Sequence, residues 1–257
     1  MSQSKFFYKL KIAYNGTYYK GWQSQVDSGP TIQDNLNLAL KKIFKSDDIS
    51  SLAAGRTDAG VSAIDQVVKI SVPFEIEPLG LLKGLNTNLP DDIRVIQLVS
   101  CEESFHPIRD AKKRTYRYYF TNEEIHNPLM VGLIYNYPYK LDISAMKLAC
   151  KLFEGEHDFE DFHCKGSEPA DTKRIIFDCD VIKVDSEHPY MAGSYYLEVS
   201  GAGFLKQMVR CIMGALLEVG RGKKQANDIS LRLKNPQGSN LSFVAPASGL
   251  IKYSVEF

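Results

Sequence analysis

The chain has 257 residues, of which 44% are hydrophobic and 24% are charged, values that are ordinary for a globular protein. This length allows one large domain or two modest ones with real cores. No apolar run approaches the roughly 20 residues that a membrane-spanning helix needs, and the N-terminal residues lack the apolar core of a signal peptide. We therefore expect a cytoplasmic protein without membrane association.

Charge and cysteine content exclude further kinds of site. The 31 basic and 31 acidic residues give a net charge of +0, so any nucleic-acid-binding face depends on how the charges are distributed. The five cysteines are widely spaced without a Cys-x-x-Cys pair, and the five histidines are scattered. A disulfide framework and a structural zinc site are therefore not expected.

The N-terminal part predicts strands interleaved with helices. Residues 8–14 alternate between apolar and other side chains, which predicts a strand with one buried face, and Asn15-Gly16 predicts a turn after it. Apolar residues at helical spacing in 32–43, with Thr31 placed as the cap, predict a helix. Further elements are expected as strands at 51–54, 66–72 and 93–99 and a helix at 78–85.

The C-terminal part repeats this mixture. A helix is predicted at 142–153 with Asp142 as its cap. The apolar stripe in 205–216 predicts another helix, which ends near Gly220. The remaining strands are expected at 114–121, 174–184, 194–200 and 253–257.

The order of these elements predicts the fold class. Several connections are short, which favours antiparallel or mixed sheets over a doubly wound parallel sheet. We expect an α+β protein made of two similar halves, with mixed, mainly antiparallel sheets flanked by helices. The halves are expected at residues 1–104 and 105–257, with an active-site cleft between them.

The short motif Gly-Arg-Thr-Asp-Ala-Gly at residues 55–60 falls between two predicted strands. Its glycines permit tight turns and close approach of a ligand or of another backbone. Taken alone, glycine and aspartate predict only a surface turn. The meaning of Asp58 therefore depends on the rest of the chain.

Six segments, in order, resemble the TruA family of tRNA pseudouridine synthases. The motif around Asp58 is similar to the catalytic loop of that family. The other matching segments are 13–17 with 21–25, 86–90 with 92–93, 105–109 with 113–118, 155–159, and 203–205 with 208–210, 214 and 218–220. One such motif would be weak, but six in order identify the chain as a member of the family.

The resemblance implies an isomerase that converts uridine to pseudouridine at positions 38, 39 and 40 in the anticodon stem-loop of tRNA. The reaction breaks the bond from ribose to N1 of uracil, turns the base and rejoins it through C5. No metal, nucleotide or redox cofactor is expected, because nothing is oxidised or hydrolysed and no phosphate is transferred. Asp58 is implied as the nucleophile, which must be ionised; whether it attacks the sugar or the base, or takes a proton from C2′, stays open.

The resemblance also implies two partners for Asp58. Arg210 flanks the predicted apolar stripe, where a solvated helix residue is the ordinary expectation. In the family it would form a salt bridge that keeps the Asp58 carboxylate ionised. Tyr116 shares a strand face with Tyr118 and Phe120, where core packing is the ordinary expectation for at least two of the three. The resemblance implies that Tyr116 stacks on the target uracil.

RNA contacts are expected beyond these residues. A uracil in a stem must flip out to reach a carboxylate, and Arg56 is implied to assist this step. Basic residues cluster at 109–117 and 206–224, which suggests phosphate contacts that position the RNA. Further RNA contacts are implied at Phe105, His106, Pro107, Ile108, Arg109, Lys113 and Arg114, and, in a poorly matching segment, at Gly166, Ser167 and Glu168. The expected partners are tRNA and a second copy of the chain, because family members often act as homodimers.

Three positions depart from the family pattern. Ser62 stands where the family has histidine, Asn15 where aspartate is common, and Asp65 where glycine is common. If position 62 contacts RNA, the choice of substrate would differ. Two alternatives remain open: a non-catalytic RNA-binding module on the same scaffold, and an unrelated α+β hydrolase with Asp58 and Asp65 as paired carboxylates.

Overall fold

The computed structural model describes residues 5–26, 29–124, 127–166, 169–188 and 190–257. The chain groups into two compact units, one made of residues 1–112 with 252–257 and the other of residues 113–251. These units differ from the expected halves because the segment before residue 113 and the end of the chain both belong to the first unit. The physical reason is apolar contact: the ring centroids of Phe105 and Phe257 are 5.2 Å apart.

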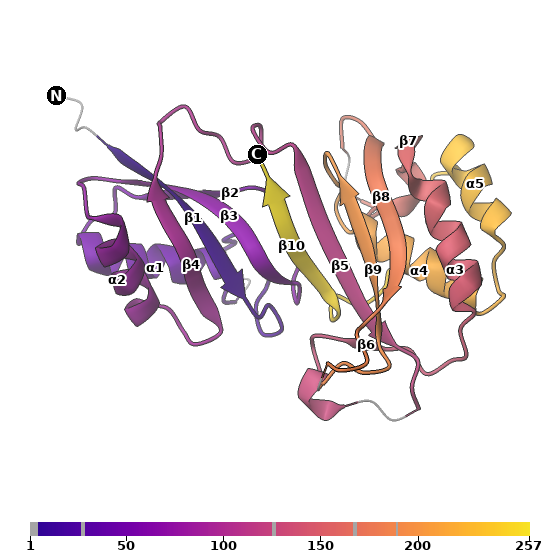
Figure 1. Ribbon diagram of the computed structural model, residues 1–257. Coiled ribbons are helices and arrows are strands. Elements are labelled where there is room, and N and C mark those ends of the chain that lie inside the picture. The colour runs from indigo at the N-terminus through magenta and orange to yellow at the C-terminus, as the bar shows by residue number, and fades with distance from the viewer. Residues whose placement is uncertain (1–4, 27–28, 125–126, 167–168, 189) are drawn as a thin grey trace. The chain divides into compact units, whose positions relative to one another are not determined.

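In the first unit, helices α1 (Ile32–Phe44) and α2 (Pro78–Asn88) pack on one face of a sheet (Figure 1). The strand order is β4 (Ile93–Ser100), β1 (Phe6–Tyr14), β3 (Ser62–Val72) and β10 (Leu250–Glu256), and the short β2 (Ser50–Ala53) also pairs with β3. The pairs β1–β3, β1–β4 and β2–β3 are antiparallel.

The period-two pattern of β1 explains how this core forms. Leu10 and Ile12 are buried and belong to one apolar cluster with Leu36 of α1 and Leu85 of α2. The predicted cap of α1 is confirmed, since the Thr31 side chain accepts a hydrogen bond from the backbone N–H of Asp34. The predicted helix at 78–85 is also confirmed and extends to Asn88.

The second unit is built in the same way. Its strand order is β5 (Lys113–Thr121), β9 (Tyr195–Gly201), β8 (Lys173–Lys183) and β7 (Gly155–Asp158), with antiparallel pairing throughout. The two-residue β6 (Tyr135–Asn136) pairs with β5 in parallel. Helices α3 (Ile143–Cys150), α4 (Met208–Gly220) and α5 (Ala226–Lys234) cover the sheet (Figure 1). Short 3-10 helices lie at Pro128–Met130, Lys151–Phe153 and Glu160–Phe162. The predicted α+β class with mixed, mainly antiparallel pairing is therefore confirmed.

Helices α3, α4 and α5 differ from the sequence prediction. The helix predicted at 142–153 is α-helical only to Cys150 and continues as the 3-10 helix Lys151–Phe153. The apolar stripe begins at Leu205, but α4 begins at Met208, because Gln207 before it adopts a left-handed conformation with φ 60°. Helix α5 was not predicted. It buries only Ile229 and Leu233, and two apolar residues give too weak a periodic signal to distinguish a helix from a loop.

Candidate active site

The loop that carries Asp58 is fixed by backbone hydrogen bonds to the segment that follows β1. The N–H of Trp22 donates to the Thr57 carbonyl at 3.1 Å, and the N–H of Gly60 donates to the Tyr19 carbonyl at 3.1 Å. Asp58 lies between these two anchors and is partly exposed. The Asp58 loop and segment 21–25, both of which resemble the family, are therefore in direct contact.

Gly21 allows the closest part of this contact. Its φ of +92° is a left-handed conformation, and a Cβ built on it would lie 2.6 Å from the Thr57 carbonyl oxygen and 3.1 Å from the carbonyl carbon of Asp58. The obstructing atoms belong to the backbone, so no side chain can turn away. Only glycine fits here without a shift of the loop.

We expect Gly21→Ala to lower the free energy of unfolding by about 2–4 kcal/mol, because it combines a left-handed alanine with a backbone clash. Urea titration followed by circular dichroism measures this loss. Gly29→Ala is the matched control: its φ is +86°, but its added Cβ would meet only the Lys20 side chain, at 3.6 Å. Equal losses in both variants would show that the contact with the Asp58 loop is not tight.

A second hydrogen-bonded connection joins the Asp58 loop, through Tyr19, to the segment before β4. The Tyr19 hydroxyl donates to Asp92 Oδ1 at 2.6 Å. Burial of the phenol, reinforced by this carboxylate, raises the pKa of Tyr19 well above its usual value, so Tyr19 remains a donor. The Asp92 carbonyl in turn accepts from the N–H of Asn15 at 2.9 Å. Tyr19 thus connects the mid-chain motif to the Asp58 loop.

The positions that depart from the family pattern have structural partners inside the first unit. Ser62 is only 4% exposed, and its hydroxyl accepts a hydrogen bond from the N–H of Gly16 at 3.0 Å. It therefore has little surface to offer to RNA. The Asp65 carboxylate pairs with Lys11 Nζ at 2.9 Å. This ion pair gives Asp65 a structural role, so the hydrolase alternative with paired carboxylates gains no support.

The predicted RNA-contacting segment 105–109 is an ordered turn. The Asp110 carboxylate accepts from the N–H of His106 at 2.8 Å and from Arg109 Nε at 3.1 Å. The hydrogen bond from the His106 backbone, and then that from Arg109, hold the pKa of Asp110 below its usual value. The carboxylate therefore stays ionised and keeps the turn closed.

The members of this turn differ in exposure. Pro107 is buried, and Phe105 packs on Phe257, whereas Ile108 and Arg109 are exposed. Ile108 and Arg109 therefore offer the most surface for an RNA contact. Arg56, in the Asp58 loop, is also exposed. Its role in base flipping remains a prediction.

In the second unit, Tyr116 lies at the edge of the core. Its ring meets that of Phe204 edge-on, with centroids 5.0 Å apart and an interplanar angle of 77°. Tyr118 and Phe120 on the same strand face are fully buried, as expected for core residues. Tyr116 is 8% exposed, so among these three rings it retains the most accessible surface.

Arg210 lies in the first turn of α4 and is held by the segment that precedes β10. Its Nε donates to the Ala245 carbonyl at 2.7 Å, and the N–H of Ala245 donates to the Arg210 carbonyl at 3.1 Å. The next carbonyl, of Pro246, accepts from the Tyr118 hydroxyl at 2.8 Å. Burial raises the pKa of Tyr118, while the nearby Arg210 charge acts in the opposite direction. Residues 245–246 therefore link Arg210 to β5.

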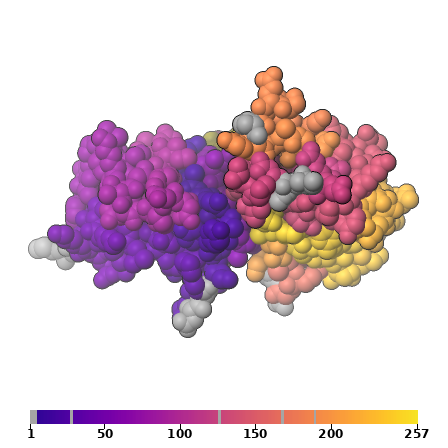
Figure 2. All heavy atoms as spheres, turned by 90° about the horizontal axis from the view of Figure 1, so that it is seen from below, coloured from indigo at the N-terminus to yellow at the C-terminus, as the bar shows by residue number. Residues whose placement is uncertain are grey.

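Sequence reasoning missed this segment, residues 241–249, which reaches the surface of the second unit (yellow in Figure 2). Its close approach to α4 depends on Gly214, since a Cβ there would lie 1.9 Å from the Phe243 carbonyl oxygen. A signal was present in the sequence: Pro246 and Gly249 are turn formers directly before the last strand. Gly249 uses this freedom, with φ at +99°.

The other residues of this unit that are predicted to contact RNA differ in their exposure. Arg114 is only 8% exposed and donates to the Ala202 carbonyl at 2.5 Å, and its burial lowers its pKa. Lys113 is half-buried. Gly166 has an open environment with φ at +77°. Ser167 and Glu168 lie outside the described residues. For all of these, the RNA contact remains a prediction.

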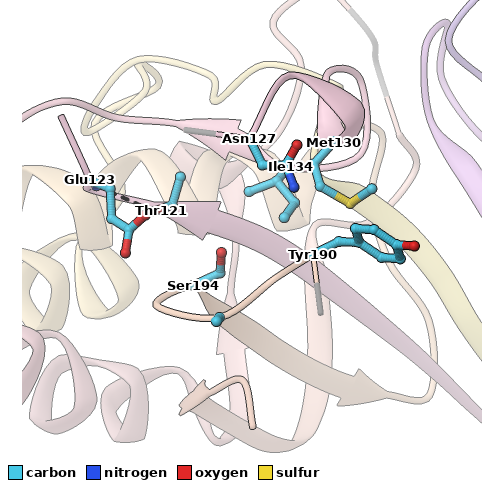
Figure 3. A pocket seen from close by; sticks show the side chains of 8 residues that line it. Thr121, Glu123, Asn127, Met130, Ile134, Tyr190 and Ser194 are labelled. Carbon is cyan, nitrogen blue, oxygen red and sulfur yellow. Dashed lines mark hydrogen bonds between the residues drawn. The ribbon is translucent and has the colours of Figure 1, made fainter. Parts of the chain in front are cut away.

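A small cavity lies at the end of β5 (Figure 3). Its volume of about 30 Å³ is near that of a single water, far below the several hundred Å³ of typical ligand pockets. It therefore does not accommodate a uracil. Its lining residues are Thr121, Glu123, Asn127, Met130, Ile134, Tyr190, Ala192 and Ser194.

The described ranges of the chain contain no group of three or more His, Cys, Asp or Glu side chains arranged to hold a metal ion. In the same ranges, no helix has the length and apolar character needed to cross a membrane.

The predicted catalytic residues are distributed over the two units. Asp58 and Arg56 belong to the first unit, and Tyr116 and Arg210 belong to the second. Hydrogen bonds inside the first unit anchor the loop that carries Asp58, and hydrogen bonds inside the second unit anchor Arg210. The ion pair between Asp58 and Arg210 and the stacking of Tyr116 on uracil stay predictions.

Comparison with known proteins assigns the family. A family model described as tRNA pseudouridine synthase matches residues 149–257. The chain is 38% identical over 259 residues to tRNA pseudouridine synthase A 2 of Desulfotalea psychrophila, covering 97% of this chain and 98% of that protein. It is also 38% identical over 246 residues to tRNA pseudouridine synthase A of Pseudothermotoga lettingae, covering 96% of this chain and 97% of that one. The identity to the enzyme of the same name from Leuconostoc mesenteroides is 34% over 256 residues, with 97% and 98% covered. The chain therefore belongs to the tRNA pseudouridine synthase A family of isomerases.

Proposed function

We propose that this protein converts uridine to pseudouridine at positions 38, 39 and 40 in the anticodon stem-loop of tRNA, with Asp58 as the nucleophile. The observation that carries the proposal is the anchoring of the Asp58 loop. Trp22 and Tyr19 hold its backbone on either side of the carboxylate, and Asp92 holds Tyr19. An ordinary surface turn does not require two separate segments, the one after β1 and the one before β4, to fix the backbone around one carboxylate.

The remaining roles follow from the chemistry of the reaction. The bond from C1′ to N1 breaks, a bond from C1′ to C5 forms, C5 loses its proton and N1 gains one, so no outside reactant is consumed. Asp58 must be ionised to act as the nucleophile. Arg210 supplies the positive charge that favours the ionised form. Tyr116 stacks on the uracil after it leaves the stem, and Arg56 assists the flipping of the nucleotide.

The proposal includes the setting in which the reaction takes place. The protein acts in the cytoplasm as a homodimer, as expected from the family resemblance. The exposed Arg56, Ile108 and Arg109 contact the tRNA, and the phosphate contacts position it without reading its sequence.

The test is an incubation of the purified protein with an unmodified tRNA transcript in the presence of a chelator and without added cofactor. Pseudouridine is then mapped by position. We expect product at positions 38 to 40 and none in a transcript that carries cytidine at these positions. Product elsewhere would overturn the assigned positions, and the absence of any product would overturn the reaction.

A further inference from the structure

A fully buried lysine lies beneath the start of the Asp58 loop. Lys252 on β10 is 0% exposed. Lysine is almost never buried to this extent unless its ammonium group is paired, because removing the charge from water is costly. Lys252 Nζ donates a hydrogen bond to Gln66 Oε1 on β3. The pairing links two strands of the first unit through their side chains.

Gln66 in turn binds the start of the Asp58 loop. It is also 0% exposed, and its Nε2 donates to the Gly55 carbonyl at 2.8 Å. An ammonium group carries only donors, so it must face the oxygen of the Gln66 amide. The amide nitrogen is then directed at Gly55. Lys252 therefore determines which way round the Gln66 amide lies.

Gly55 lies two residues after the end of β2, in the segment that leads to Asp58. Its φ of +131° lies in the region that favours glycine, so the local backbone conformation needs support from its surroundings. Lys252 Nζ lies 3.6 Å from the place that a Cβ on Gly55 would occupy. The N–H of Ala54, one residue earlier, donates to the Val67 carbonyl at 2.8 Å. The start of the loop is thus held from both β3 and β10.

We propose that Lys252 is a positioning residue for Asp58, which acts through Gln66 and Gly55; this inference rests on the proposed role of Asp58 as the nucleophile. Without the ammonium group, Gln66 is free to turn its amide, and the Gly55 carbonyl then loses its donor. The path of the loop changes at its first residue, and the carboxylate three residues later moves with it. Such a displacement affects the chemical step more than the binding of tRNA, because binding draws on many contacts.

The first test compares Lys252→Met with the wild type in pseudouridine formation, at a temperature where circular dichroism shows both to be folded. We expect kcat to fall about 10- to 100-fold, while KM for tRNA changes less than about threefold. Lys11→Met is the matched control, because it removes another lysine of the same sheet that pairs with a partner on β3. Its kcat should stay within about twofold of wild type.

A double-mutant cycle tests whether Lys252 acts on Asp58 through Gln66 and Gly55. Gln66→Leu should lower kcat about as much as Lys252→Met, and the double variant should lose no more than either single variant, because both remove the same hold on Gly55. Lys252→Arg retains a donor-only side chain and should restore most of the lost kcat. If Lys252→Met does not fold, Gln66→Leu decides the question. A kcat close to that of wild type in Gln66→Leu would overturn the proposal, as would losses that add.

Asp58→Asn, assayed on the same tRNA, separates the two levels of inference. If Asp58→Asn is inactive and Lys252→Met retains full kcat, only the positioning role is overturned. If Asp58→Asn is active, the proposed role of Asp58 as the nucleophile fails, whatever the Lys252 variants do. A change in melting temperature with an unchanged kcat would assign Lys252 to the stability of the sheet and would also overturn the positioning role.

Discussion

Asp58→Asn is expected to lower pseudouridine formation by more than about 1,000-fold while tRNA binding stays within about threefold of wild type. Asparagine has almost the same shape as aspartate, but it carries no charge and cannot act as a carboxylate nucleophile. The loop should keep its path, because its anchors to Trp22 and Tyr19 use backbone atoms that the substitution leaves in place. The loss should therefore appear in the chemical step alone.

Single-turnover product formation and a gel-shift titration measure these two quantities separately. Asp65→Asn is the matched control, since Asp65 is a second carboxylate seven residues later that pairs with Lys11. It should retain activity within a few-fold. Full activity in Asp58→Asn would disprove the nucleophile, and equal losses in both variants would favour the alternative with paired carboxylates.

Arg210→Met is expected to lower the turnover number about 100-fold. The substitution removes the charge proposed to keep Asp58 ionised. It also removes the hydrogen bond from Arg210 Nε to the Ala245 carbonyl, which links α4 to the segment before β10. Arg210→Lys separates the two effects, because lysine keeps the charge but lacks the Nε donor and the planar fork.

The turnover number is measured for both variants and for the control Arg174→Met. Among the contacts described for it, the Arg174 side chain donates to two carbonyls close in sequence, that of Asp171 at 3.1 Å and that of Lys173 at 2.5 Å. This control should stay within about twofold of wild type. If Arg210→Met has the turnover number of the control, Arg210 plays no part in the chemical step. If Arg210→Lys is as inactive as Arg210→Met, the fixed geometry of the guanidinium matters more than its charge.

The positions of the predicted residues show how far local patterns carry. The alternation in residues 8–14 predicted β1, and helical spacing with Thr31 as the cap predicted α1, because both signals lie within a few neighbouring residues. Helix α5 gave no such signal, since it buries only two apolar residues, and its start depends on a reciprocal cap between Gln225 and Asp228.

Local patterns also did not assign the functions of single polar residues. Ser62 was singled out as a place where an RNA contact could differ, but its hydroxyl is turned inward to the N–H of Gly16. Arg114, whose RNA contact remains a prediction, is only 8% exposed and donates to the Ala202 carbonyl. The reason is that an alternating pattern predicts which residues share a face of a strand, but it does not predict which other elements pack on that face.

By itself, the sequence determined the α+β class, most of the strands and helices, the family and the position of Asp58 in its glycine-flanked loop. These features depend on spacing along the chain and on the order of motifs. Only the tertiary structure decided what holds that loop: Tyr19 bonded to Asp92, and Lys252 directing Gln66 at Gly55. The contacts Tyr19–Asp92 and Lys252–Gln66 join residues more than 70 positions apart, and a hydrogen bond over such a separation is selected by the packing of the whole unit and leaves no periodic trace in the sequence.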